Sequence, residues 1–233
     1  MINLAEIGSD ILELFFPKVC ITCGNRLMTQ EKFICLDCYH DLPRTNFIRD
    51  PDNKAAQLFW GRVMAEFVFS YYYFRKGSKY QKLVHYFKYK GQKELGYEAG
   101  KWMGSLISVN PDKCMFDVVV PVPLHPKKEK QRGYNQSEWI ARGISDYLGK
   151  PIENGNLIRL VYTNSQTRRR RFERWQNVEG IFGIKDPQRF SGKHLLLVDD
   201  VLTTGSTLES CATELLKIPG VKISMATLAF SEL

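Results

Sequence analysis

The sequence predicts an α/β fold in which a parallel sheet is flanked by helices, with a small four-cysteine module ahead of it. Two apolar, strand-like runs, at 118–122 and 194–198, are each followed by a segment with helical spacing of apolar residues. Strands that alternate with helices are typical of a parallel sheet. Four cysteines in two Cys-x-x-Cys pairs lie within residues 20–38. A chain of 233 residues is long enough for one core domain and a small appendage.

The composition is that of a soluble globular protein, with 44% hydrophobic and 25% charged residues. No apolar run approaches the roughly 18 residues that span a membrane, so no membrane span is expected. Residues 1–18 carry three acidic residues and no basic leading segment, which argues against a secretory signal and favours a cytoplasmic protein. We expect an amphipathic helix there, docked on its own domain or on a partner. The net charge of +8 suits an anionic ligand but does not choose between a small molecule and nucleic acid.

The four cysteines form a metal-binding pattern. Cys20 and Cys23 make one pair, Cys35 and Cys38 the other, and eleven residues separate the pairs. Four thiolates favour tetrahedral Zn²⁺, and a site with four protein ligands is closed and therefore structural. Two disulfides or a redox pair are the alternative, less favoured because no secretory signal precedes them. The sequence therefore predicts a structural zinc site.

Three parts are expected along the chain. Residues 1–50 would form the N-terminal helix and the zinc-binding module, 51–110 a hood-like subdomain, and 111–233 the core domain. The polar segment 43–54 contains two prolines and is expected to be a linker.

The hood-like part contains a basic, aromatic segment. Residues 75–93 hold seven lysines and arginines, three tyrosines and one phenylalanine, and no acidic residue. Such a mixture can follow a phosphate backbone while stacking bases. An amphipathic helix around Leu83, Val84 and Phe87 with a solvated basic face is the favoured alternative. The flanking runs 63–74 and 94–107 predict one or two strands and a further helix.

A second basic segment follows the strand predicted at 117–123. That strand ends in prolines, which cannot continue pairing inside a sheet. Ligands of α/β sheets bind at the loops that follow the carboxyl ends of strands. We therefore expect residues 124–134 to be a basic loop suited to a diphosphate. Asn135 is expected to cap the next helix.

The most basic run follows a strand predicted at 157–162. Residues 168–174 contain five arginines in seven positions. A lid that closes over a multiply charged ligand would use such a run. A solvated or nucleic-acid-binding patch is nearly as consistent with it. Residues 221–230 predict the last strand.

Residues 193–216 combine a strand, an acidic pair and a turn that can hold phosphate. Asp199 and Asp200 end the apolar run, and the turn 203–207 contains three threonines, one serine and Gly205. Backbone N–H groups at the start of a helix bind anions, and glycine lets the backbone approach closely. The carboxylates would repel a phosphate, so we expect them to face sugar hydroxyls or a metal that bridges to them. A phosphorylated ribose satisfies both halves; an ordinary capped helix is the alternative.

The stretch LLLVDDVLTTGST resembles the PRPP-binding motif of type I phosphoribosyltransferases. The resemblance implies a type I phosphoribosyltransferase-like sheet, Mg²⁺ bound together with PRPP, and ribose hydroxyls held by Asp199 and Asp200 as the catalytic residues. The implied phosphate-binding residues are Val201, Leu202, Thr203, Thr204, Gly205, Ser206 and Thr207. The residues expected at the diphosphate and in the lid are Lys127, Lys128, Lys130, Arg132, Arg168 and Arg169.

The order of motifs along the chain resembles the ComF family of the ComFC/GntX type. The cysteine pairs, VPVPLHP, RGYNQS and VDDVLTTGST follow one another as in those proteins. That family is linked to competence and to uptake of transforming DNA. The resemblance implies a DNA-import ATPase as a further partner, and the zinc module and basic surfaces suit single-stranded DNA.

Two classes of function remain. An active transferase would stabilise an oxocarbenium-like transition state at the anomeric carbon by positioning and electrostatics. A glutamine-dependent form is not expected, because residue 2 is Ile and no glutaminase domain fits ahead of the cysteines. The alternative is a catalytically inactive nucleotide-binding module that binds single-stranded DNA or the ATPase. We lean toward the enzyme.

Overall fold

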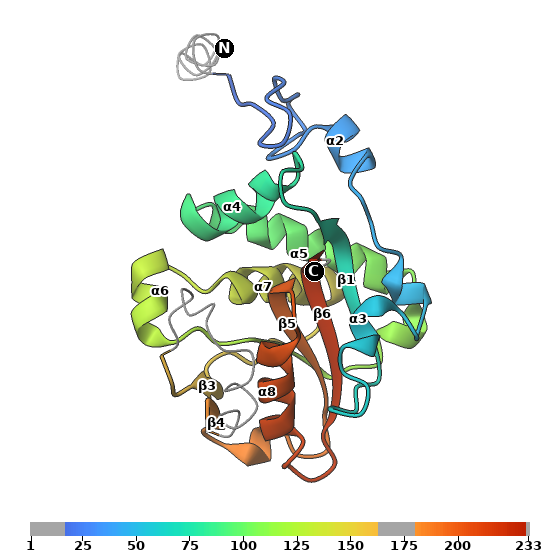
Figure 1. Ribbon diagram of the computed structural model, residues 1–233, viewed down its shortest axis with the longest axis vertical. Helices are drawn as coiled ribbons and strands as arrows, with labels where there is room; N and C mark the ends of the chain where they lie inside the picture. Colours follow the sequence, from blue (N-terminus) through green and yellow to red (C-terminus); the bar gives the residue numbers. More distant parts are fainter. Residues whose placement is uncertain (1–16, 163–179, 232–233) are drawn as a thin grey trace, which may run out of the picture.

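The computed structural model describes residues 17–162 and 180–231 (Figure 1). The helix expected near the N-terminus falls largely within 1–16, and the arginine-rich run with Arg168 and Arg169 falls within 163–179. Both lie outside the described residues.

Four strands form a parallel sheet in the order β1-β6-β5-β2. They are β1 (Val68–Phe74), β2 (Val118–Pro121), β5 (His194–Leu202) and β6 (Lys222–Ser231). Every neighbouring pair is parallel, with Val198 opposite Ala226 and Val120 opposite Leu197. The residues 195–198 of β5 are fully buried, as a central strand covered on both faces requires. The predicted parallel sheet is confirmed.

Helices cover this sheet. The α-helices are α2 (Leu36–His40), α3 (Lys54–Gln57), α4 (Gln81–Tyr89), α5 (Lys93–Ser108), α6 (Pro126–Arg132), α7 (Gln136–Leu148) and α8 (Ser206–Leu215). Short 3₁₀ turns are η1 (Phe47–Arg49), η2 (Pro111–Lys113) and η3 (Pro187–Arg189). Helix α7 packs on β2 and β5, α5 packs on α7, and α8 contacts β5 and β4. In Figure 1 α8 lies in front of the sheet and α5 and α7 pass behind it.

Glycines allow α5 and α7 to approach closely. A Cβ atom on Gly143 would lie 2.0 Å from the carbonyl oxygen of Tyr97, and one on Gly100 would lie 2.1 Å from that of Ile140. These distances are far shorter than any van der Waals contact, so the two backbones touch. This contact fixes α7, whose first turn lies at the carboxyl end of the sheet.

The structure corrects two expectations about local elements. The basic segment after β2 is not a loop but the helix α6, in which the His125 ring accepts a hydrogen bond of 3.2 Å from the N–H of Lys127. The strand predicted at 157–162 is shorter, β3 (Leu157–Arg159), and pairs antiparallel with β4 (Phe182–Ile184) in a separate two-stranded sheet. The helices expected around Leu83 and at 94–107 are confirmed as α4 and α5, and Asn135 caps α7 as expected.

The division of the chain at residue 110 stays a prediction. Strand β1, from the hood-like part, pairs with β6 of the core, and α5 packs on α7. Within residues 17–162 and 180–231, no helix combines the length and apolar character needed to cross a bilayer.

Candidate functional site

The carboxyl end of β5 carries a small polar cavity. Its volume is about 30 Å³, and its lining is continuous in sequence apart from one position. The lining residues are Asp199 and the run Val201, Leu202, Thr203, Thr204, Gly205, Ser206, Thr207 and Leu208. The structure thus brings the predicted phosphate-binding residues around one cavity, beside the first carboxylate of the acidic pair.

The turn in this cavity opens directly into α8. Gly205 precedes the helix with φ +79°, a conformation that residues with a Cβ rarely adopt. The first helical hydrogen bond runs from the N–H of Glu209 to the Gly205 carbonyl at 2.9 Å. The N–H groups of the preceding turn therefore have no acceptor within the helix, and the helix dipole adds partial positive charge there. The hydroxyls of Thr204 and Ser206 lie 2.9 Å apart and add donors.

The two carboxylates of the pair have different surroundings. Asp199 accepts hydrogen bonds of 2.8 Å from the Ser137 hydroxyl and of 2.8 Å from the N–H of Asp200. Burial, followed by the charge of Asp200, raises the pKa of Asp199 to about 6. Asp200 instead forms an ion pair with Lys88, whose Nζ lies 2.8 Å from Oδ2. One carboxylate therefore lines the polar cavity, and the other faces a cation.

The four basic residues predicted to hold a diphosphate lie on helix α6 and differ in their exposure to solvent. Lys128 and Arg132 are half-buried, whereas Lys127 and Lys130 are exposed. The pKa of Lys128 is lowered by burial and by the positive charges of Arg132, Arg159 and Lys88, with Asp200 opposing the shift. Lys128 therefore lies within the electrostatic field of the acidic pair.

Three residues of this region were not predicted from the sequence to belong to a site. Lys88 contacts Asp200, Ser137 contacts Asp199, and the charge of Asp199 acts on Arg159, whose pKa burial lowers. Only Ser137 had a usable sequence signal, because it follows the predicted helix cap Asn135 by two residues. The contacts of Lys88 and Arg159 depend on tertiary packing.

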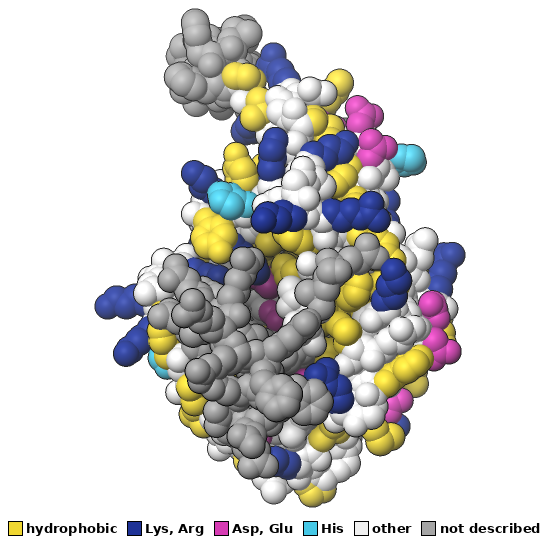
Figure 2. Space-filling view, in the orientation of Figure 1, with side chains coloured by type: hydrophobic (Ala, Val, Ile, Leu, Met, Phe, Trp, Pro, Cys, Tyr) yellow, Lys and Arg dark blue, Asp and Glu magenta, His cyan; other side chains and the backbone are white. Residues whose placement is uncertain are grey.

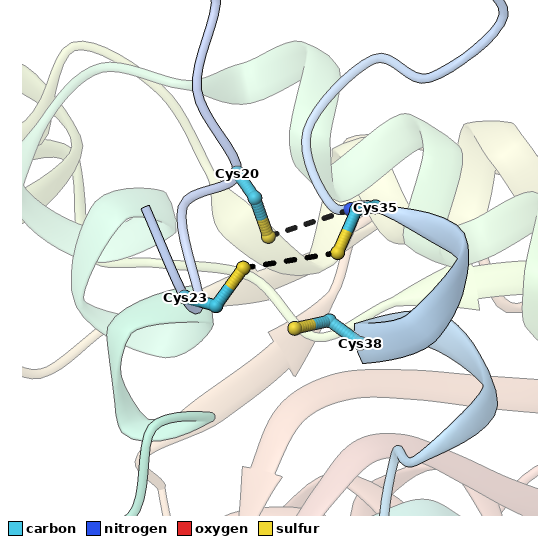
Figure 3. Close-up of side chains that lie close together, drawn as sticks. All are labelled: Cys20, Cys23, Cys35 and Cys38. Atoms are coloured by element: carbon cyan, nitrogen blue, oxygen red, sulfur yellow. Dashed lines mark hydrogen bonds between the residues drawn. The ribbon is translucent and has the colours of Figure 1, made fainter. Parts of the chain in front are cut away.

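The four predicted metal ligands converge at the N-terminal module (Figure 3). The Sγ atoms of Cys20, Cys23, Cys35 and Cys38 all lie within 4.8 Å of one another, and those of Cys23 and Cys35 are 3.8 Å apart. A tetrahedral zinc ion with Zn–S bonds of about 2.3 Å requires sulfurs about 3.8 Å apart. All six cysteines of the chain lie in the described residues and are free thiols. The four-cysteine cluster is therefore compatible with structural zinc, and the two-disulfide alternative is not observed.

Backbone N–H groups support thiolates in this cluster. The N–H of Cys35 points at Cys20 Sγ at 3.4 Å, and that of Asn25 at Cys23 Sγ at 3.5 Å. Burial raises the pKa of Cys20, but hydrogen bonds from the backbone outweigh it and bring the pKa to about 6. At Cys35 and Cys38 burial prevails and raises the pKa, so among these three thiols the backbone favours the thiolate form at Cys20 only. A deprotonated sulfur is what a metal ion needs as a ligand.

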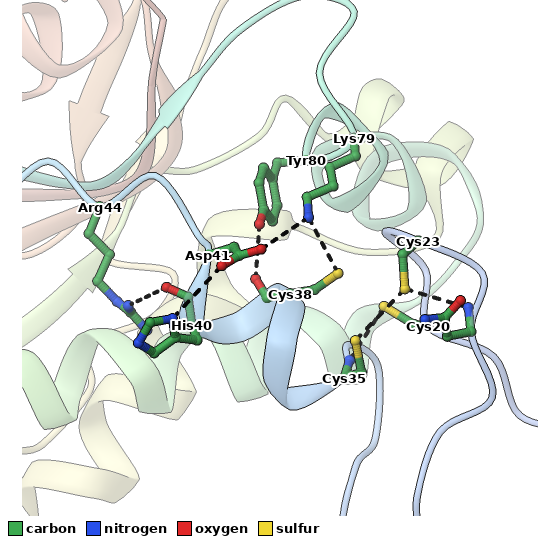
Figure 4. Close-up of polar contacts among 10 residues, drawn as sticks. Cys20, Cys23, Cys35, Cys38, His40, Asp41, Arg44, Lys79 and Tyr80 are labelled. Carbon is green, nitrogen blue, oxygen red and sulfur yellow. Dashed lines mark hydrogen bonds and ion pairs between the residues drawn. The ribbon is translucent and has the colours of Figure 1, made fainter.

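Helix α4 is attached to the cluster by its N-terminal end (Figure 4). Tyr80 donates a hydrogen bond of 3.2 Å to the Cys38 carbonyl, and Lys79 lies 3.8 Å from Cys38 Sγ and 3.6 Å from Asp41. Lys82 donates to the Thr22 carbonyl at 3.1 Å. Several of the basic residues of α4 thus contact the protein itself, which favours the amphipathic-helix interpretation of 75–93 over a backbone-tracking surface.

Comparison with known proteins agrees with this geometry. The phosphoribosyl transferase domain family matches residues 120–231, the part that carries α6, the acidic pair and the turn. Competence protein F of Haemophilus influenzae is 32% identical over 114 residues, 48% of this chain and 50% of that protein. The DNA utilization protein YhgH of Salmonella typhi is 33% identical over 101 residues, 43% of this chain and 44% of that protein.

A longer match reaches the N-terminal module. Competence protein ComFC of Bacillus subtilis is 29% identical over 201 residues, 86% of this chain and 78% of that protein. For Competence protein F and YhgH, by contrast, the match spans about half of the relative's length. The fold and site thus define a protein with a phosphoribosyltransferase-type domain. More particularly, the predicted resemblance is confirmed: the chain is similar to the ComF-type competence proteins and has a four-cysteine cluster ahead of that domain.

Proposed function

We propose that this protein binds PRPP or a related ribose phosphate at the carboxyl end of β5. The observation that supports this most is that Asp199, the first carboxylate of the acidic pair, and a helix-initiating turn line one polar cavity. The turn 203–207 would hold the 5′-phosphate through backbone N–H groups and hydroxyls. Asp199 and Asp200 would accept hydrogen bonds from the ribose hydroxyls.

The donor set also fits magnesium brought by the ligand. Two carboxylates alone make an incomplete site, and one of them is paired with Lys88. Mg²⁺ is usually held by one or two carboxylates together with substrate phosphates. Magnesium bound to PRPP would offset charge on the diphosphate, while Asp199 and Asp200 would orient the sugar.

If transfer occurs, the diphosphate leaves the anomeric carbon and an acceptor nucleophile replaces it. The protein's own contribution is to position the sugar and stabilise charge on the leaving group. Lys128 and Arg132 would stabilise the negative charge of the leaving diphosphate. The more exposed Lys127 and Lys130 would lie at the edge of the diphosphate site. Arg168 and Arg169 are expected to assist from the segment outside the described residues. No residue of the chain needs to form a covalent bond.

The double variant Asp199→Asn with Asp200→Asn tests the site. Calorimetry should show at least a 100-fold loss of PRPP affinity while the far-UV circular dichroism spectrum is unchanged. The matched control is Asp112→Asn, an exposed carboxylate on η2, which should bind as the wild type does. Equal affinity in the double variant and the wild type would rule out this site.

A role linked to DNA uptake in the cytoplasm is the wider proposal. Relatives are named for competence and DNA utilization, and the chain carries a net charge of +8. Lys and Arg side chains gather over α4 and the four-cysteine module (Figure 2); the exposed ones there include Lys76 and Lys90. Single-stranded DNA or a DNA-import ATPase would bind this surface in the alternative, non-catalytic function.

Pyrophosphate release separates the enzyme from the binding module. PRPP should be incubated with the protein and a panel of bases and amines. Release with one acceptor supports the transferase. No release with any acceptor, together with DNA binding that weakens steeply as salt rises, supports the binding module.

A further inference from the structure

Helix α4 places a lysine at the acidic pair from a part of the chain that the phosphoribosyltransferase family match does not include. Lys88 Nζ lies 2.8 Å from Asp200 Oδ2, and their side chains are only 20% and 13% exposed. Removing two charges from water is costly, so an ion pair at this depth is weak evidence for stability. A role in ligand binding accounts for its position better than a role in folding.

The position of Lys88 is built by several contacts. Phe87 is buried, and its ring fills the space at Gly96 of α5, where a Cβ atom would lie 2.1 Å from the ring. The Tyr134 hydroxyl, just after α6, donates a hydrogen bond to the Phe87 carbonyl. The last turn of α4 is therefore held between α5 and the α6–α7 connection, which aims Lys88 at the site.

The charges around the acidic pair do not balance. Lys88, Lys128 and Arg159 interact electrostatically there with one or both of the carboxylates Asp199 and Asp200, and the charge of Arg132 acts on Lys128. Burial, followed by the positive charges of Arg132, Arg159 and Lys88, disfavours the charged form of Lys128 and lowers its pKa. A ligand group with two or more negative charges beside Asp200 would relieve this repulsion.

The geometry distinguishes which anionic group of the ligand this is. The cavity of the turn 203–207 is lined by Asp199 but not by Lys88. A carboxylate has about four lone-pair sites, so Asp200 can hold Lys88 on Oδ2 and still accept from a ribose hydroxyl. An anionic group at Lys88 would then lie next to the ribose hydroxyls, which places it on carbon 1 and not on carbon 5.

We propose that Lys88 is a binding residue for the diphosphate on carbon 1 of the ribose, bridging it to Asp200. This inference rests on the proposed ribose-phosphate site and adds a specificity element to it. The Lys88 ammonium group would supply part of the positive charge needed between the Asp200 carboxylate and the diphosphate. Lys88 would thereby make the site select a ribose that carries both phosphate groups.

The test compares two ligands that differ only at carbon 1. Affinities for PRPP and ribose 5-phosphate are measured by calorimetry on the full chain. Lys88→Gln keeps a hydrogen-bond donor beside Asp200 but removes the charge. It should lose at least tenfold in PRPP affinity and less than threefold in affinity for ribose 5-phosphate. Lys88→Arg should stay within threefold of wild type for both ligands.

The control is Lys90→Met, which removes the same charge from an exposed position just past α4 and should change neither affinity. Equal weakening of both ligands by Lys88→Gln, no change, or tighter binding would each overturn the assignment of Lys88. If Lys88→Gln does not fold, Lys88→Met is measured in its place: a loss of PRPP affinity above tenfold with less than threefold loss for ribose 5-phosphate supports a direct contact, and any other result overturns it. A wild-type protein that binds neither ligand would overturn the proposed function itself.

Discussion

The hydroxyl of Tyr80 donates a hydrogen bond of 3.2 Å to the backbone carbonyl of Cys38, a cysteine of the four-cysteine cluster. Eight residues further along the same helix, Lys88 contacts Asp200. Helix α4 therefore contacts the four-cysteine cluster at one end and the acidic pair at the other. The integrity of the cluster should consequently affect the ligand site through a rigid element of nine residues.

Loss of the metal is the first prediction. Purified reduced protein should contain about one zinc per chain, and Cys35→Ser should remove it and unfold the N-terminal module. Tryptophan fluorescence should change, because the ring of Tyr39 in the module lies 5.3 Å from that of Trp102 on α5. PRPP affinity should fall several-fold as the N-terminal anchor of α4 is lost.

Cys114→Ser is the matched control, since Cys114 is a free, half-buried cysteine outside the cluster. It should keep the zinc and the fluorescence of the wild type. A metal-free wild type with the same fluorescence as Cys35→Ser would contradict the prediction.

Local patterns in the sequence predicted most of the site. The cysteine pairs and the run Asp199–Thr207 are each short segments whose spacing alone indicates their chemistry. The partners of the acidic pair could not be found this way, because Ser137 lies 62 positions from Asp199 and Lys88 reaches Asp200 only after α4 docks on α5.

Helix α6 was missed for another reason. Its seven residues are almost all charged or polar, so no apolar periodicity reveals it. Pro126 at its first position and Gly133 with φ +84° after its end are ordinary boundary signals. The segment was nevertheless expected to be a ligand-binding loop, because it is basic and follows the carboxyl end of a predicted strand.

The raised pKa of Asp199 predicts a pH-dependent stability. The folded state holds a proton on Asp199 up to a pKa of about 6, whereas the unfolded chain releases it near 3.9. Because the folded state binds more protons in this window, the free energy of unfolding falls as pH rises from about 4 to about 6. Asp199→Asn removes this pH-dependent loss of stability, because asparagine does not titrate. It also keeps a side-chain oxygen that can accept the hydrogen bond from the Ser137 hydroxyl.

The stability gain of Asp199→Asn over the wild type should therefore grow with pH across this window, to on the order of 2 kcal/mol, and then level off. Urea unfolding at pH 4.5 and pH 7.5 measures it. The same gain at both pH values would show that Asp199 titrates normally.

Gly143→Ala tests the close approach of α5 and α7. In an isolated helix, alanine is more stable than glycine by about 1 kcal/mol. Here the new Cβ would lie 2.0 Å from the backbone oxygen of Tyr97, which cannot rotate away. Overpacking should outweigh propensity and destabilise the protein by about 1–3 kcal/mol. Thermal unfolding against Ser105→Ala, a half-buried position on α5, measures this; a stabilised Gly143→Ala would contradict the packing.

Gly205→Ala should separate ligand binding from stability. Gly205 has φ +79°, and a Cβ atom there would lie 3.1 Å from the ring of Phe59, so the substitution strains the backbone of the turn and crowds that ring. Gly149, after the far end of α7, has φ +63°, and a Cβ atom there would meet nothing within 4 Å. Both alanine variants should lose about 1–2 kcal/mol of stability, the cost of a left-handed conformation.

Only Gly205→Ala should also weaken ribose 5-phosphate binding, by tenfold or more, because the N–H groups ahead of α8 no longer converge on the phosphate. Calorimetry with ribose 5-phosphate on both variants measures the difference. If Gly149→Ala weakened binding as much, the effect would come from lost stability and the turn would not be the phosphate site. If Gly205→Ala bound as the wild type does, the phosphate would have to lie elsewhere on the sheet edge, and the acidic pair would need a different ligand.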